Sequence, residues 1–238
     1  MAPSNKTRPR SGCIGGTLRL IGRAIVVFLL VSVGLTVIYR FVPPPVTLTM
    51  LFDPNGFTKD WTPLSAIDRN MVSAVVAAED AKFCSHDGFD RSAIEKAIQS
   101  NAQGKRLRGG STISQQTAKN AFLWQGEGVS RYARKGLEVW FTFLIEHIWG
   151  KRRIMEVYLN VAETGIGTYG AEAGAQRYFH HSAGNLSRTE AARIAAALPS
   201  PKTRAVVAPG GFTRRYGNKI AARSGVVENG ALDACVYH

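Results

Sequence analysis

The chain has few cysteines and no metal-ligand spacing. Only three cysteines occur among its 238 residues, at Cys13, Cys84 and Cys235. Three cysteines do not build the framework of a disulfide-rich fold, and their spacing matches no metal site. Cys84 and Cys235 can pair in an oxidising compartment, but the sequence alone does not show whether they do. A structural or incidental role is the default for all three.

Motifs for nucleic-acid binding are also missing, although the net charge is +13. The chain contains no zinc-finger spacing, no RNA-binding signature and no basic zipper. Its basic charge therefore favours an anionic membrane surface or a phosphorylated substrate. We expect no nucleic-acid partner.

The N-terminus lacks acidic residues. The first 23 residues contain five basic ones: Lys6, Arg8, Arg10, Arg19 and Arg23. The segment Ala24–Tyr39 carries no charge, and Phe41 and Val42 extend it toward the roughly 20 residues that a membrane-spanning helix needs. The positive-inside rule then places the N-terminus in the cytoplasm and the rest of the chain outside. Part of the positive charge is therefore topological, because the remaining sequence has 25 basic residues against 17 acidic ones.

A cleaved signal peptide and a buried core helix are the alternatives to an uncleaved anchor. No small-x-small cleavage site follows the apolar segment, which ends in Arg40 and leads to Pro43–Pro45. A core helix is rarely preceded by five basic residues and followed by three prolines. We therefore expect a single-pass anchor, with the prolines as a stiff spacer.

Strand signals are scarce, so the fold is predicted to be mainly α. Weak alternation predicts one short strand at Val46–Leu51. Apolar spacing and capping residues predict helices at about residues 67–82, 91–101, 114–122, 130–148, 151–160, 171–179 and 187–198. The basic, glycine-containing tail is predicted to be poorly ordered. The expected segments are a cytoplasmic segment (1–23), an anchor (24–42), a linker (43–50), a globular domain (51–203) and the tail (204–238).

Glu79 and Asp80 end a predicted helix whose other residues are largely apolar. A carboxylate at the edge of an apolar helix can have a raised pKa and act as a base near neutral pH. The alternative is a solvated helix end, which is the commoner role of such a pair. His86 has no second His or Cys at ligand spacing, so it is interpreted as a hydrogen-bonded structural histidine.

A glycine- and hydroxyl-rich segment, Gly109–Thr112, precedes the predicted helix 114–122. Two glycines let the backbone turn tightly and approach a ligand, and the following helix N-terminus can bind an anion. Lys119 lies about one turn beyond Gln116, on the same face. The segment lacks the Gly-Lys-Ser/Thr of nucleotide phosphate loops. An ordinary capped turn is an equal alternative.

Arg134, Lys135 and Glu138 lie on the long predicted helix 130–148. Arg134 and Glu138 are four residues apart, and by default they would form a surface ion pair worth about 0.3–0.5 kcal/mol. In the functional alternative, Arg134 holds phosphate oxygens and Glu138 is the second acid of a carboxylate pair. Most other residues of this helix are apolar, so it is either buried or partly in lipid.

These motifs occur together, in the same order, in one known family. They are Glu79-Asp80-x-x-Phe83-x-x-His86-x-Gly88, Gly109 to Gln116 with Lys119-Asn120, Arg134-Lys135-x-x-Glu138, Lys151 to Asn160, Gly165 to Gly170, and Ala197-Leu198-Pro199. With them, the chain from about Leu51 to Pro201 resembles the monofunctional biosynthetic peptidoglycan transglycosylases. Their glycosyltransferase domain is shared with class A penicillin-binding proteins.

The resemblance implies a lysozyme-like helical lobe and a smaller membrane-associated lobe, preceded by the transmembrane helix. It implies that residues 51–203 polymerise lipid II into β-1,4-linked glycan strands, with inversion and release of undecaprenyl pyrophosphate. The implied place is the outer side of the bacterial cytoplasmic membrane. The implied partners are lipid II, the growing glycan chain and membrane lipid, with proteins of the division or elongation machinery as further candidates.

The resemblance also implies roles for individual residues. Glu79 would be the general base, and Glu138 would orient the cations or assist the leaving group. The implied substrate-binding residues are Asp80, His86, Ser111, Thr112, Gln116, Lys119, Asn120, Arg134 and Lys135. A divalent cation, Mg²⁺ or Mn²⁺, is compatible with this chemistry, but no carboxylate cage is visible and no metal site is assigned.

Two other functions stay open, and one is excluded. A lysozyme-like lytic hydrolase would use a catalytic glutamate but has little need of a phosphate clamp. A non-catalytic membrane-anchored scaffold that only binds lipid II or partners would not need the glutamate. Transpeptidase activity is not expected, because the chain has no Ser-x-x-Lys and Lys202-Thr203 is followed by Arg204 where that class has glycine.

Overall fold

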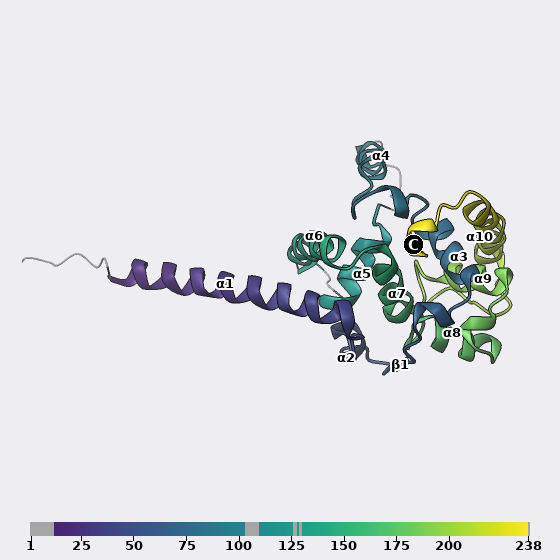
Figure 1. Cartoon of the computed structure of the whole chain (residues 1–238), viewed down its shortest axis with the longest axis horizontal. Coiled ribbons are helices and arrows are strands. Elements are labelled where there is room, and N and C mark those ends of the chain that lie inside the picture. The colour runs from purple at the N-terminus through teal and green to yellow at the C-terminus, as the bar shows by residue number, and fades with distance from the viewer. Residues whose placement is uncertain (1–11, 103–109, 126–127, 129, 238) are drawn as a thin grey trace, which may run out of the picture.

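The computed structural model describes residues 12–102, 110–125, 128 and 130–237, and it is mainly helical (Figure 1). The helices are α1 Gly12–Phe41, α2 Leu48–Leu51, α3 Arg69–Glu79, α4 Arg91–Ala102, α5 Ile113–Phe122, α6 Ser130–Ile148, α7 Lys151–Val161, α8 Ala171–Phe179, α9 Arg188–Ala197 and α10 Gly211–Asn229. The 3-10 turns are η1 Leu64–Ala66, η2 Phe83–Ser85, η3 Ala183–Asn185 and η4 Ala234–Val236. The prediction of a mainly α fold is confirmed.

A small three-stranded sheet, in the order β1-β3-β2, interrupts the helices. Its strands are β1 Thr58–Lys59, β2 Glu163–Gly165 and β3 Thr168–Tyr169. The strand predicted at Val46–Leu51 is wrong. The side chain of Thr47 instead accepts a hydrogen bond from the backbone N–H of Met50, which caps the short helix α2.

Helix α1 is long and apolar enough to cross a membrane. Its candidate span, Gly16–Phe41, covers 26 residues with a mean hydropathy of 2.4. The N-terminal part of α1 projects away from the other helices (Figure 1). The helix begins earlier than the anchor expected at 24–42. Two tryptophans hold its C-terminal half on α6 and on the turn beyond: Trp140 Nε1 donates to Ser32 Oγ (3.0 Å) and Trp149 Nε1 donates to Thr36 O (2.7 Å).

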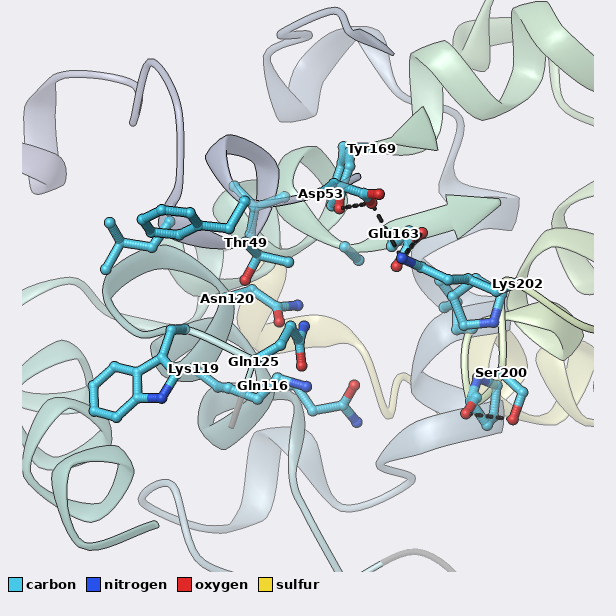
Figure 2. Close-up of a pocket in the computed structure, with 18 of the residues that line it drawn as sticks. Thr49, Asp53, Gln116, Lys119, Asn120, Gln125, Glu163, Tyr169, Ser200 and Lys202 are labelled. Carbon is cyan, nitrogen blue, oxygen red and sulfur yellow. Dashed lines mark hydrogen bonds and ion pairs between the residues drawn. The ribbon is translucent and has the colours of Figure 1, made fainter. Parts of the chain in front are cut away.

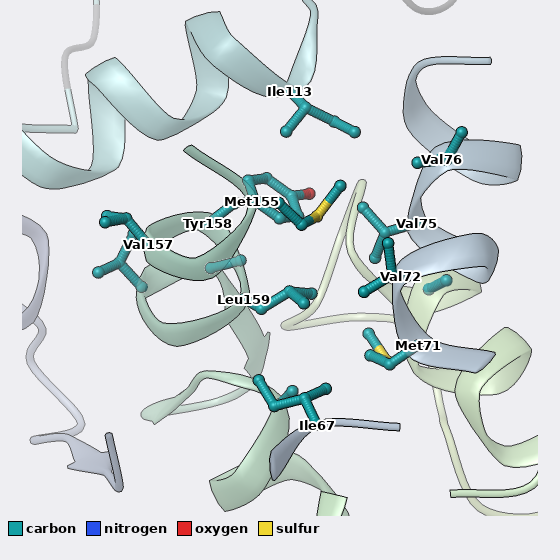
Figure 3. Close-up of a cluster of buried hydrophobic side chains, with 14 of the residues drawn as sticks. Ile67, Met71, Val72, Val75, Val76, Ile113, Met155, Val157, Tyr158 and Leu159 are labelled. Atoms are coloured by element: carbon teal, nitrogen blue, oxygen red, sulfur yellow. The ribbon is translucent and has the colours of Figure 1, made fainter. Parts of the chain in front are cut away.

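The part of the core nearest the site lies between α3, α5 and α7 (Figure 3). Residues 71–77 of α3 are all buried, so the helix is enclosed on every side. Met155 and Leu159 of α7 and Ile113 of α5 face it (Figure 3). Because dense packing leaves little freedom, this core fixes the end of α3, where Glu79 and Asp80 lie.

The tail is ordered, contrary to the prediction. Helix α10 packs on α3 and α9, and a disulfide joins Cys84 to Cys235. Ile220 and Val227 of α10 are buried, and the small residues Gly217 and Ser224 are buried on the same face. These positions recur at helical spacing and form an apolar stripe. The basic residues between them hid that stripe in the composition of the tail.

Candidate active site

Glu79 lies at the last position of α3. Its Oε2 accepts a hydrogen bond from Gln116 Nε2 of α5 at 2.8 Å. Its Oε1 is shielded from solvent and has no hydrogen-bond partner among the described residues. Burial raises the pKa of Glu79, while the Gln116 hydrogen bond and the charges of Arg204 and Lys119 oppose this rise. The carboxylate therefore has one free oxygen and an affinity for a proton.

Tyr158 of α7 fixes the orientation of the amide that holds Glu79. Its hydroxyl donates to Gln116 Oε1 at 3.3 Å, so the amide nitrogen of Gln116 is left to face the carboxylate. Tyr158 is buried. Sequence reasoning missed it, because an aromatic residue within an apolar stripe is the normal content of a core helix.

Asp80 is adjacent to Glu79 but is saturated with donors. His86 Nε2 contacts both of its oxygens at 3.0 Å, and the backbone N–H of Ile113 donates to Oδ2 at 3.1 Å. Ile113 begins α5, so this carboxylate also faces a helix N-terminus, which favours negative charge. The geometry favours a structural role for Asp80 and His86, in which they join the end of α3 to the start of α5.

Asp80→Ala is expected to destabilise the protein. The substitution leaves the Ile113 N–H and the His86 ring without their acceptor, and an unsatisfied buried donor costs about 1–3 kcal/mol. The free energy of unfolding in denaturant measures this loss. Asp87→Ala is the control, since Asp87 is a nearby exposed carboxylate. Equal stability of the two variants would contradict the structural role.

The hydroxyl-rich segment before α5 is a capping box. Thr112 Oγ1 accepts from the backbone N–H of Gln115 and donates to Gly88 O at 2.6 Å, while Gln115 Oε1 accepts from the Thr112 N–H. The Thr112 hydroxyl is thus committed to the fold. Ser111 is exposed and lines, with Glu79, a small hollow of about 190 Å³. Gly109 of the predicted motif lies outside the described residues.

A larger cavity of about 760 Å³ lies beside α5 (Figure 2). Gln116, Lys119 and Asn120 form one wall, as the sequence spacing predicts for residues on one helical face. Gln116 therefore contributes to this wall and also contacts Glu79. The structure therefore brings Glu79, at the end of α3, against the same face of α5 that carries Lys119.

Lys202 lies across the cavity from Lys119 (Figure 2). Lys202 is paired with Asp53 at 3.2 Å and Glu163 at 3.6 Å. Burial would raise the pKa of Asp53, yet hydrogen bonds from Asn55, Tyr169 and Lys202 hold it well below its usual range. Within the described part of the chain, Lys119 has no ion-pair partner. Lys119 is therefore the cation that the cavity wall leaves open to an anion.

Arg134, Lys135 and Glu138 lie on α6 and do not line this cavity. Glu138 is only 3% exposed. Its Oε2 accepts from Arg134 Nη1 at 3.1 Å, and its Oε1 accepts from Lys135. The prediction of a surface pair is wrong, because α6 packs against α1 and α5 and encloses the Glu138 carboxylate. Arg134 Nε is buried without a partner among the described residues.

The charges on α6 act on Lys119. Burial lowers the pKa of Lys119. Glu138 opposes this decrease, whereas Arg134 and Lys135 add to it. Arg134, Lys135 and Glu138 are therefore close enough to Lys119 for their charges to affect its pKa. Among the described residues, no group of three or more His, Cys, Asp or Glu side chains is placed to hold a metal ion.

The chain is similar to known proteins over most of its length. A family model described as Transglycosylase matches residues 47–223. The chain is 51% identical over 203 residues to a biosynthetic peptidoglycan transglycosylase of Caulobacter vibrioides, covering 84% of this chain and 87% of the relative. It is 45% identical over 223 residues to the protein of the same name from Rhodospirillum centenum, covering 92% and 95%. A third, from Bdellovibrio bacteriovorus, is 46% identical over 214 residues, covering 84% of each.

Proposed function

This chain belongs to the transglycosylase family, and we propose that it is a peptidoglycan glycosyltransferase that joins the disaccharides of lipid II into β-1,4-linked glycan strands. The observation that carries this function is a proton-accepting Glu79 within electrostatic range of Lys119, the cation of the adjacent cavity wall that has no ion-pair partner in the described chain. A hydrolase of finished strands has no need of such a cation, since no phosphate leaves.

Glu79 acts as the general base. It accepts the proton of the 4-hydroxyl group on the N-acetylglucosamine of the acceptor lipid II. That oxygen bonds to C1 of the N-acetylmuramic acid at the reducing end of the growing chain. The bond between C1 and the diphosphate oxygen breaks, undecaprenyl pyrophosphate leaves with the electron pair, and the configuration at C1 changes from α to β. The raised pKa of Glu79 supports this role, because a base is most effective when its pKa approaches the working pH.

Lys119 stabilises the negative charge that develops on the diphosphate. Its burial makes the interaction stronger than it would be in water. Arg134 and Lys135 share the charge of Glu138, so they contribute less positive charge than two free cations. We assign Glu138 the orientation of these two cations, one of the two roles that the resemblance left open; its ion pairs with both support this assignment.

The substrate reaches the cavity from the membrane. Helix α1 anchors the chain, with the N-terminus in the cytoplasm and the catalytic domain outside. The cavity wall includes Leu48 and Phe52, which lie shortly after α1 and are 40% and 72% exposed. These apolar side chains suit the polyprenyl tail of lipid II, whereas Lys119 suits its diphosphate. The anchor holds the enzyme and its lipid substrate at the same surface.

A polymerisation assay tests the function. The full chain in detergent is incubated with lipid II, and the products are separated by gel electrophoresis, with and without moenomycin. We expect glycan strands, one undecaprenyl pyrophosphate released for each bond formed, and inhibition by moenomycin. Shortening of preformed strands without growth from lipid II would instead identify a lytic hydrolase. Binding of lipid II without turnover would identify a scaffold.

A further inference from the structure

The C-terminal segment, residues 204–237, contacts α3 at its start, and we call this segment the C-terminal clamp. Asp233 is completely buried. Its carboxylate accepts from Arg69 at 2.8 and 3.2 Å and from Ser73 Oγ at 2.9 Å. Both partners belong to α3. Because a buried carboxylate costs free energy unless it is paired, this contact strongly favours one position of α3.

The clamp contacts α3 again at its end, next to Glu79. Tyr216 of α10 donates its hydroxyl to Ala78 O at 3.1 Å. The Arg204 guanidinium lies over the Tyr216 ring at 5.8 Å and over the Phe212 ring at 5.3 Å. It also donates to Ala196 O at 2.7 Å. Arg204 is therefore held at a defined place between α9 and α10.

The disulfide adds a third contact, beyond the end of α3. Cys84 follows Glu79 by five residues, and Cys235 is in the last turn of the clamp. The backbone around Glu79 is thus held on one side by Ala78 and on the other by Cys84. Glu79 is the residue that the proposed reaction requires to be in place.

We propose that the C-terminal clamp positions the catalytic base, and that Arg204, held over the ring of the Tyr216 that bonds Ala78, is the positioning residue of the clamp next to Glu79. This inference rests on the proposed function. It assigns a role in the reaction to a segment that extends beyond the family match, which ends at residue 223.

Several charged groups act on the pKa of Glu79, and Arg204 is one of them. Asp80 raises the pKa of Glu79, whereas Arg204 and Lys119 lower it against the dominant effect of burial. Tyr158 stays neutral, because burial raises its own pKa well above the usual value. Arg204 and Lys119 are therefore the two cations that oppose burial. Lys119 also faces the substrate, which leaves Arg204 as the cation committed to the base.

The pH dependence of polymerisation tests this role. In Arg204→Gln the base is protonated up to a higher pH, so the acidic limb of the rate profile moves to higher pH. The ratio of the rate at about pH 5.5 to the rate at about pH 8 is expected to be about threefold or more lower in the variant than in the wild type. Arg204→Lys keeps the charge and should restore much of the wild-type profile. Lys219→Gln removes an exposed charge from α10, elsewhere in the clamp, and should leave the profile unchanged.

The outcomes separate this proposal from the proposed function. A wild-type chain that makes no glycan contradicts the function itself. If the wild type polymerises and Arg204→Gln keeps its pH profile while losing rate equally at every pH, Arg204 is merely structural and the proposal is overturned.

A second variant applies if Arg204→Gln does not fold. Tyr216→Phe keeps the ring under Arg204 and removes only the hydroxyl that holds Ala78 O. We expect kcat to fall about threefold or more with KM unchanged, since misplacing a catalytic group affects turnover rather than binding. An unchanged kcat would overturn the proposal.

Discussion

Glu79→Gln is expected to lower the rate of glycan polymerisation by about 10²–10⁴-fold, the usual contribution of a general base. The amide has nearly the same shape and can still accept the Gln116 hydrogen bond, but it cannot take a proton from the acceptor hydroxyl. The polymerisation assay measures the loss. Glu95→Gln is the control, because Glu95 is an exposed glutamate on α4. Wild-type activity in Glu79→Gln would show that another group is the base.

The same variant should be more stable than the wild type at neutral pH. The pKa of Glu79 is raised above its model-peptide value of 4.5, so the folded state holds the proton more tightly than the unfolded state. The stability of the wild type therefore falls as the pH rises from the unfolded pKa through the raised folded pKa. A glutamine at position 79 does not ionise, so the variant avoids this loss of stability.

Thermal unfolding at two pH values checks the sign. The stability advantage of Glu79→Gln should be present at about pH 8. It should disappear near about pH 4, where Glu79 of the wild type is largely protonated in both the folded and the unfolded state. A variant that is less stable than the wild type at both pH values would mean that the carboxylate serves the fold.

The local structure was predictable where the signal is local. The predicted helices 130–148 and 171–179 match α6 and α8. The helix predicted at 187–198 also forms, as α9, and a capping box of Ser187 and Glu190 begins it. Such contacts join residues three or four apart, so the sequence contains the whole interaction. The N-terminal apolar helix is confirmed for the same reason, because its signal is a continuous run.

The order of the tail could not be predicted in this way. The apolar stripe of α10 is stable only because α3 and α9 cover it, and neither is close in sequence. Asp233 likewise needs Arg69, which lies 164 residues away. Helices in folded proteins gain most of their stability from such packing rather than from propensity. A basic, glycine-containing segment therefore resembles a disordered tail until its partners are known.

The division of roles between the two neighbouring carboxylates was also out of reach. Glu79 and Asp80 differ little as a sequence pair. Their difference arises because the N–H of Ile113 points at Asp80, whereas the side chain of Gln116 meets Glu79. One carboxylate is saturated and the other keeps a free oxygen. The sequence motif identified the pair of carboxylates, but the hydrogen-bond donors that distinguish them depend on where α5 packs.

Arg134 is a poor test of the phosphate-binding role. Arg134→Met would leave the buried Glu138 with Lys135 as its one remaining ion-pair partner in the described structure, and Lys135 is 46% exposed. Breaking a buried pair by removing one partner costs about 3–5 kcal/mol. Lost activity in this variant would therefore mix a folding defect with a catalytic one.

Lys119→Met separates the two effects. We expect kcat to fall about 10²–10³-fold, comparable to the loss of one preorganised group that stabilises developing negative charge. Methionine keeps the aliphatic length and removes only the charge that faces the diphosphate. The fold should not suffer, because burial lowers the pKa of Lys119. The protonated form is then less stable in the folded state than in the unfolded one, and this cost is fully present at pH values below the lowered pKa.

Lys119→Met should accordingly melt at the same temperature as the wild type or higher, while turnover nearly stops. Lys219→Met, at an exposed position of α10, should change neither quantity. A Lys119→Met enzyme that keeps kcat within about twofold would show that the diphosphate leaves without this cation. A variant that loses stability together with activity would instead place Lys119 in the fold, and the cavity wall of α5 would no longer mark the leaving-group site.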